Sequence, residues 1–217
     1  MTMRKIANEV VQKAATYAGY RELVDQLLAE GKSTGPHQSE ALTHYSELNV
    51  ARMRRLDKTT KLQEETFTFI RSLDRPMIWL TLTEGWCGDA AQIVPVVEKI
   101  AAESDLVEHR IILRDEHPAI MDQFLTNGGR SIPKIIFLDA ESLNVLGDWG
   151  PRPEEVQERV MEAVETLRNM EAGEAKKAYE YELKKDVQLW YAKDKTRSVQ
   201  AEFLNALEKA LATASVD

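Results

Sequence analysis

The fold is decided by residues 77–100, which read MIWLTLTEGWCGDAAQIVPVVEKI. Residues 77–83 form a short apolar run with β-branched and aromatic side chains, which is typical of a buried strand. Apolar side chains then recur at helical spacing over residues 89–103, and Pro95 should kink that helix. The sequence therefore predicts a turn from strand to helix, and Cys87 lies in this turn.

Working outward, the pattern predicts further strands at 107–113, 134–138 and 143–149, and helices near 119–125 and 154–170. The turn at 139–142 is short enough for a hairpin, so the last two strands should be antiparallel. The order is that of an α/β domain with a mixed central sheet of about four strands flanked by helices.

Helical patterns continue on both sides of this region. A helix is expected over 4–30, bent or split at Gly19, followed by a helix capped by Ser39 and another over 60–73. Two more helical stripes follow at 179–190 and 199–211, the first being a solvated face rather than a binding tail. We therefore expect an N-terminal helical extension (1–75), a central domain (76–170) and a C-terminal helical extension (171–217).

Composition excludes several classes of protein. The 217 residues carry a net charge of -8, which argues against a nucleic-acid partner because phosphate binding needs clustered Lys and Arg. The single cysteine excludes an intramolecular disulfide and any zinc site built on two cysteines. The four histidines show no ligand spacing and are expected at the surface, so neither a metal nor another cofactor is predicted.

The N-terminal basic residues are not followed by an apolar run, so no secretory signal is expected. The longest apolar stretch, at 77–82, is far shorter than a membrane span. We therefore expect a cytoplasmic protein without a membrane partner.

Two residues point to chemistry. A thiol at a helix N-terminus ionises more easily than a free thiol, so Cys87 is expected to be partly exposed with a lowered pKa. Asp89 would cap the helix and oppose the thiolate. Pro133 precedes the third strand in Ser131-Ile132-Pro133 and is a candidate for a cis peptide bond beside Cys87.

Together these motifs resemble the thioredoxin superfamily over roughly residues 76–170. Its W-C-x-x-C site corresponds to Trp86-Cys87-Gly88-Asp89-Ala90, its helix-kinking proline to Pro95, and its cis-proline loop to residues 130–133. Residues 147–150 resemble the glycine-containing loop after the last strand. The whole chain looks like a bacterial group of thioredoxin family proteins, and the resemblance implies a thioredoxin-like fold.

The chain departs from that pattern at two positions. Ala90 stands where the family has its resolving cysteine, so nothing in the chain can release a mixed disulfide formed at Cys87. Thr81 stands where the family has a buried acid that assists the resolving thiol. An ordinary dithiol reductase is therefore not expected.

The resemblance implies that Cys87 is the catalytic residue of a monothiol thiol-disulfide exchange with a protein client or a low-molecular-weight thiol. The substrate-binding residues would be Trp86, Gly88, Asp89, Ile132, Pro133 and Gly150. The guanidinium groups of Arg130 and Arg152, and more weakly Arg114, are candidates to contact a thiolate or an anion. A non-enzymatic binding module that uses the same groove is the alternative, and in it the helical extensions are candidates for a homodimer interface.

Overall fold

The computed structural model describes residues 4–214. Its four strands are β1 (Met77–Thr83), β2 (Val107–Leu113), β3 (Lys134–Asp139) and β4 (Val145–Trp149). The helices before the sheet are α1 (Asn8–Lys13), α2 (Tyr17–Ala29), α3 (Glu40–Thr59) and α4 (Glu64–Arg71). Within and after it come α5 (Ala90–Ala101), the 3₁₀ turn η1 (Arg114–Glu116), α6 (Pro118–Met121), α7 (Glu154–Asn169), α8 (Glu174–Asp194) and α9 (Arg197–Ala214).

The strands form one mixed sheet in the order β2-β1-β3-β4. β1 is parallel to β2 and antiparallel to β3, and β3 pairs with β4 as the predicted antiparallel hairpin. The parallel pair needs a crossover, and α5 supplies it. The carboxyl end of β1 therefore opens directly into the turn that carries Cys87, which is confirmed as a strand-to-helix turn.

Alternate side chains of β1 enter two separate cores, one on each face of the sheet. Trp79 lies in the core that α5 and α9 cover, and Leu80 lies in the core that contains Cys87. In the first core Phe203 of α9 packs edge-on against Trp79, with ring centroids 4.9 Å apart, and against Phe137 at 5.4 Å. The last helix is thus an integral part of the sheet's packing.

The helix predicted over residues 4–30 is interrupted between Lys13 and Tyr17, and not at Gly19. The helix ends at Lys13, and Ala15 forms an isolated antiparallel bridge with Ile111 through two backbone hydrogen bonds of 2.9 and 2.8 Å. Thr16 then caps α2 by accepting the N–H of Gly19. Gly19 is therefore inside the first turn of α2, and the prediction that it bends or splits the helix was wrong, because a tertiary contact sets the break.

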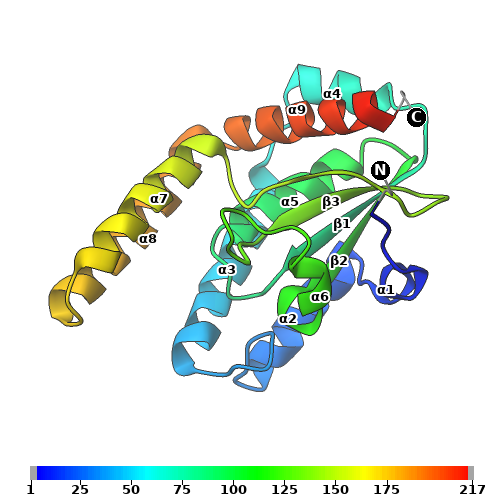
Figure 1. The fold of residues 1–217 in the computed structure, drawn as a ribbon. Coiled ribbons are helices and arrows are strands. Elements are labelled where there is room, and N and C mark those ends of the chain that lie inside the picture. Colours follow the sequence, from blue (N-terminus) through cyan, green and yellow to red (C-terminus); the bar gives the residue numbers. More distant parts are fainter. Residues whose placement is uncertain (1–3, 215–217) are drawn as a thin grey trace.

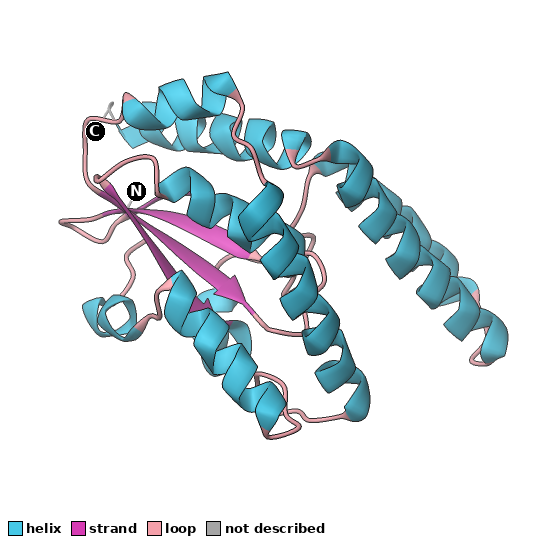
Figure 2. Ribbon diagram, turned by 180° about the vertical axis from the view of Figure 1, so that it is seen from behind, coloured by secondary structure: helices cyan, strands magenta, loops and turns pink. Residues whose placement is uncertain are grey.

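The remaining helices keep their predicted order with changed lengths. Ser39 caps α3 as expected, and Pro95 lies inside α5. α6 is only four residues long, so the helix predicted over 119–125 is cut short. Figure 1 shows α7 and α8 as a helical pair that extends away from the sheet, while α9 returns beside α4. Figure 2 shows the same pair from behind.

Candidate functional site

The turn between β1 and α5 places the thiol against the loop before β3. The backbone N–H of Cys87 donates to the Glu84 carbonyl at 3.1 Å, which closes the turn. The thiol donates to the carbonyl oxygen of Ile132 at 3.3 Å and accepts the N–H of Ala90 at 3.5 Å. Two predicted site residues that are 45 positions apart are thus in direct contact.

Pro133 and Gly150 complete this side of the site. The Ile132–Pro133 peptide bond is cis. Gly150 has a φ of +115°, and a Cβ at this position would collide with the Pro133 carbonyl oxygen. Only glycine fits there, because it tolerates this backbone conformation and has no Cβ. The structure therefore brings Cys87, Ile132, Pro133 and Gly150 into one region, as the sequence predicted.

The exposure and ionisation predicted for Cys87 were wrong. The residue is only 8% exposed and belongs to the core beneath α2 and α3. Burial raises the pKa of the Cys87 thiol from 9.0 to about 12, and the carboxylate of Asp89 adds to the rise. The Ala90 N–H and the Arg152 guanidinium act in the opposite direction, but they do not outweigh desolvation.

Asp89 is held by two side chains from outside the turn. Its Oδ2 accepts two hydrogen bonds from Arg152, at 3.1 and 2.7 Å, and its Oδ1 accepts one from the Tyr191 hydroxyl at 3.0 Å. Asp89 occupies the N-cap position of α5, yet its side chain makes no capping hydrogen bond. The predicted cap is therefore absent, because the carboxylate is used to join α5 to Arg152 and α8.

The three candidate arginines have different surroundings. Arg152 lies at the site and acts on Cys87 through Asp89 and its own charge. Arg130 is exposed and binds both oxygens of Asp122, at 2.6 and 2.7 Å, so the structure does not bring it to the thiol. The Arg114 guanidinium lies 4.8 Å from the ring centroid of half-buried Trp86, a cation–π contact at the rim of the site.

The buried carboxyl group of Glu84 connects the Cys87 turn to the loop before α3. Glu84 is completely buried, accepts the backbone N–H of Asp115 at 2.9 Å and is bound by the Thr34 hydroxyl. The same Thr34 oxygen accepts the N–H of Gly85 at 2.8 Å. Burial raises the pKa of Glu84. The loop before α3 thus holds the Cys87 turn in place, a role that its composition did not indicate.

Helices α3 and α8 contribute further side chains that the sequence did not point to. The amide of Gln188 on α8 donates to the Gly88 carbonyl at 3.4 Å and accepts a hydrogen bond from Gln92 at 2.7 Å. Asn49 on α3 donates to the Gly85 carbonyl at 2.9 Å and accepts from Arg52 at 2.7 Å. The C-terminal half of α8 therefore rests on the Cys87 turn, so this helix is not a merely solvated face.

Thr81, at the position of the family's buried acid, belongs to a polar chain within the core. Its hydroxyl lies 2.9 Å from Nε2 of His109, and Nδ1 of His109 lies 2.8 Å from a carboxylate oxygen of Glu98. His109 is buried, so the prediction of four surface histidines was wrong for this residue. This pairing is not evident from the sequence, because the three residues lie on β1, β2 and α5.

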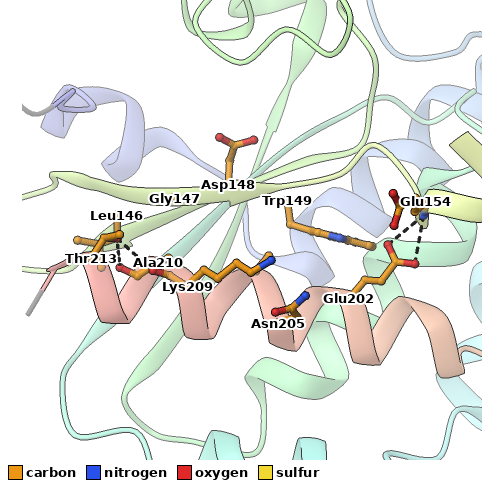
Figure 3. Close-up of a pocket in the computed structure, with 11 residues that line it drawn as sticks. Leu146, Gly147, Asp148, Trp149, Glu154, Glu202, Asn205, Lys209, Ala210 and Thr213 are labelled. Atoms are coloured by element: carbon orange, nitrogen blue, oxygen red, sulfur yellow. Dashed lines mark hydrogen bonds between the residues drawn. The ribbon is translucent and has the colours of Figure 1, made fainter.

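A groove at the surface lies away from the thiol. It has a volume of about 410 Å³ and lies between β4 and α9, with a lining that includes Trp149, Glu202 and Lys209 (Figure 3). Trp149 points toward α9 and Asp148 points away from it. Residues 147–149 of the predicted glycine-containing loop line this groove, but Cys87 and the other predicted site residues do not, so the Cys87 turn remains the candidate site.

Among residues 4–214, no group of three or more His, Cys, Asp or Glu side chains is arranged to hold a metal ion. None of the helices in the described part of the chain combines the length and apolar character that a membrane span requires.

The fold and the site define a protein with a thioredoxin-like α/β fold and one cysteine at the strand-to-helix turn. The sequence model described as "Thioredoxin" matches residues 35–172, more than half of the chain, and the chain therefore belongs to the thioredoxin family. No curated protein matches it.

Two solved structures are similar to the chain. One is a protein of unknown function from Pseudomonas aeruginosa, with 19% identity over 82% of this chain and 96% of that chain, at a TM-score of 0.45. The other is an HIV epitope scaffold, with 21% identity over 82% of this chain and 96% of that chain, at a TM-score of 0.44.

Proposed function

We propose that the protein is a monothiol thioredoxin-like protein with a W-C-G-D-A site, in which Cys87 forms mixed disulfides. One observation carries this proposal. The chain's single thiol lies between the N-terminus of α5 and the loop that ends in Pro133, and it contacts both. A partner's sulfur would meet Cys87 there, and its extended backbone would lie along Ile132 and Pro133 as an added strand.

The exchange requires the site to open. In the described conformation the thiol is buried, and a pKa of about 12 leaves only ~10⁻⁵ of it as thiolate at neutral pH. Gln188 and Tyr191 of α8 bind the residues that follow Cys87. Movement of the C-terminal half of α8 away from the turn would hydrate the thiol and lower its pKa. We therefore propose that α8 controls access to Cys87.

The mixed disulfide would be released by an external thiol, because no second cysteine exists in the chain. The wild-type protein is therefore expected not to reduce insulin disulfides catalytically. Residue 90 lies directly against the sulfur, since its backbone N–H is 3.5 Å from Sγ. Ala90→Cys should therefore give measurable insulin reduction in the presence of a dithiol, whereas Ala91→Cys, one position further along the helix, should not. Wild-type turnover equal to that of the Ala90→Cys protein would contradict the monothiol assignment.

The alternative is a binding module in which Cys87 has no redox role. The burial of the thiol and its raised pKa favour this alternative. The rate of iodoacetamide alkylation as a function of pH separates the two functions. A monothiol that reacts from an opened site should show a rate that rises through an apparent pKa well below 12. A permanently closed thiol should react only as the protein unfolds.

A further inference from the structure

Arg52 of α3 lies beside the residue that follows Cys87. Its Nη1 is 3.6 Å from the point that a Cβ on Gly88 would occupy. The same nitrogen donates to Oδ1 of Asn49 at 2.7 Å, and Asn49 in turn holds the Gly85 carbonyl. The half-buried guanidinium is thus fixed to the Cys87 turn through Asn49.

Two cations of α3, Arg52 and Arg55, lie near each other without an ion-pair partner among the described residues. Among residues 4–214, no carboxylate lies within 4.0 Å of Arg52 or Arg55. Arg55 donates to the side-chain oxygen of Gln92 at 3.3 Å. Asn49 and Gln92 are neutral acceptors, so neither guanidinium forms an ion pair with a carboxylate of the described residues.

The nearest negative charge is already occupied. The carboxylate of Asp89 acts on Arg52, but its two oxygens are bound by Arg152 and Tyr191. Burial lowers the pKa of Arg52, and the positive charge of Arg55 adds to this effect. A guanidinium remains charged in proteins, so a half-buried one beside a second cation favours an added anion. Its remaining N–H groups match the two oxygens of a carboxylate.

We propose that Arg52, supported by Arg55, binds a carboxylate of a small acidic disulfide that reacts at Cys87. This inference rests on the proposed function and names its substrate class. In the reaction the sulfur of Cys87 attacks one sulfur of the disulfide and forms a new S–S bond. The original S–S bond breaks, and the departing half leaves as a thiol that takes up the proton of Cys87. The small disulfide is reduced and Cys87 is oxidised.

The test compares three symmetric disulfides of different charge: oxidised glutathione (anionic), 2-hydroxyethyl disulfide (neutral) and cystamine (cationic). Mass spectrometry follows the mixed disulfide at Cys87 at low ionic strength, and each rate is divided by that of 2-mercaptoethanol with the same disulfide. The wild-type protein should prefer oxidised glutathione over cystamine by about tenfold or more, and salt should weaken this preference. If the opening of the site at Cys87 limits the rate with all three disulfides, the same comparison is made with the Tyr191→Phe protein.

Arg52→Gln should lower the rate with oxidised glutathione about tenfold relative to the neutral disulfide, and Arg52→Lys should keep part of the preference. The ratio to the neutral disulfide cancels any change in access to Cys87. Arg54→Gln is the matched control, because Arg54 lies on the same helix and pairs with Asp25. A charge preference that Arg52→Gln leaves unchanged, or faster reaction with cystamine, would overturn this inference alone. No reaction with any disulfide, in either background, would overturn the proposed function as well.

Discussion

Replacing Tyr191 by Phe removes one hydroxyl group from the contact between α8 and the Cys87 turn. That hydroxyl donates to Oδ1 of Asp89 at 3.0 Å, and the tyrosine ring is otherwise buried. The variant keeps the ring and its packing, so the substitution isolates the hydrogen bond. If α8 must leave the turn before Cys87 can react, the variant should open more often than the wild type.

The size of the effect follows from the charge of the acceptor. A hydrogen bond to a charged group contributes about 1.5–3 kcal/mol. The closed form of the variant lacks this contribution, whereas the opened forms of the two proteins are equivalent. Each 1.4 kcal/mol is a factor of ten, so the fraction of opened molecules should rise roughly tenfold to a hundredfold.

The assay is alkylation of Cys87 by iodoacetamide under native conditions, followed by intact mass. When closing is faster than alkylation, the observed rate is proportional to the fraction of opened molecules. Tyr181→Phe is the matched control, because Tyr181 lies on the same helix and is 65% exposed. An alkylation rate of Tyr191→Phe within twofold of the wild type, or an equal acceleration in Tyr181→Phe, would refute the reasoning.

Three further predictions concern the charges around the thiol and the core. Asp89→Asn should lower the pKa of Cys87 by about one pH unit, because it removes a like charge and frees Arg152. The thiolate absorbance as a function of pH measures this pKa, and Asp122→Asn, which removes a carboxylate paired with Arg130, is the control. A thiol whose pKa is raised on folding stabilises the protein below pH 9, and this stability is lost as the pH rises toward 12. Between pH 9 and pH 12, the free energy of unfolding should therefore fall by up to about 4 kcal/mol more in the wild type than in Cys87→Ser, as measured by urea titration. The same dependence of the unfolding free energy on pH in both proteins would contradict this prediction. Phe203→Ala should cost about 3–5 kcal/mol by the same titration, since it empties the centre of the aromatic cluster.

Local patterns were sufficient to predict much of the sheet and its turn. The apolar run of β1, the helical spacing of α5 and the short loop before β4 each carry their own signal within a few residues. The position of the loop that ends in Pro133 beside Cys87 was predicted from the paired motifs rather than from periodicity, and Cys87 contacts the neighbouring Ile132 of that loop. The division into segments 1–75, 76–170 and 171–217 stays a prediction, and the family match begins at residue 35, within the first segment.

What the sequence did not predict depends on contacts between distant segments. Gln188 and Tyr191 lie about one hundred positions from the residues they bind, at Gly88 and Asp89. Cys87 is buried in the core beneath α2 and α3, and this burial raises its pKa, so a prediction based on the helix N-terminus alone had the wrong sign. Arg52 is one of several arginines on α3, and only the fold distinguishes it from its paired neighbour Arg54.

The most direct measurement of the central claim is the formation and release of a mixed disulfide at Cys87. The wild-type and Tyr191→Phe proteins are incubated with 2-hydroxyethyl disulfide, and Cys87→Ser is the control. We predict one adduct per chain in both proteins, formed faster in Tyr191→Phe, stable after removal of the reagent and released on addition of an external thiol. No adduct in either folded protein would contradict the account and leave the binding module as the function that the site supports.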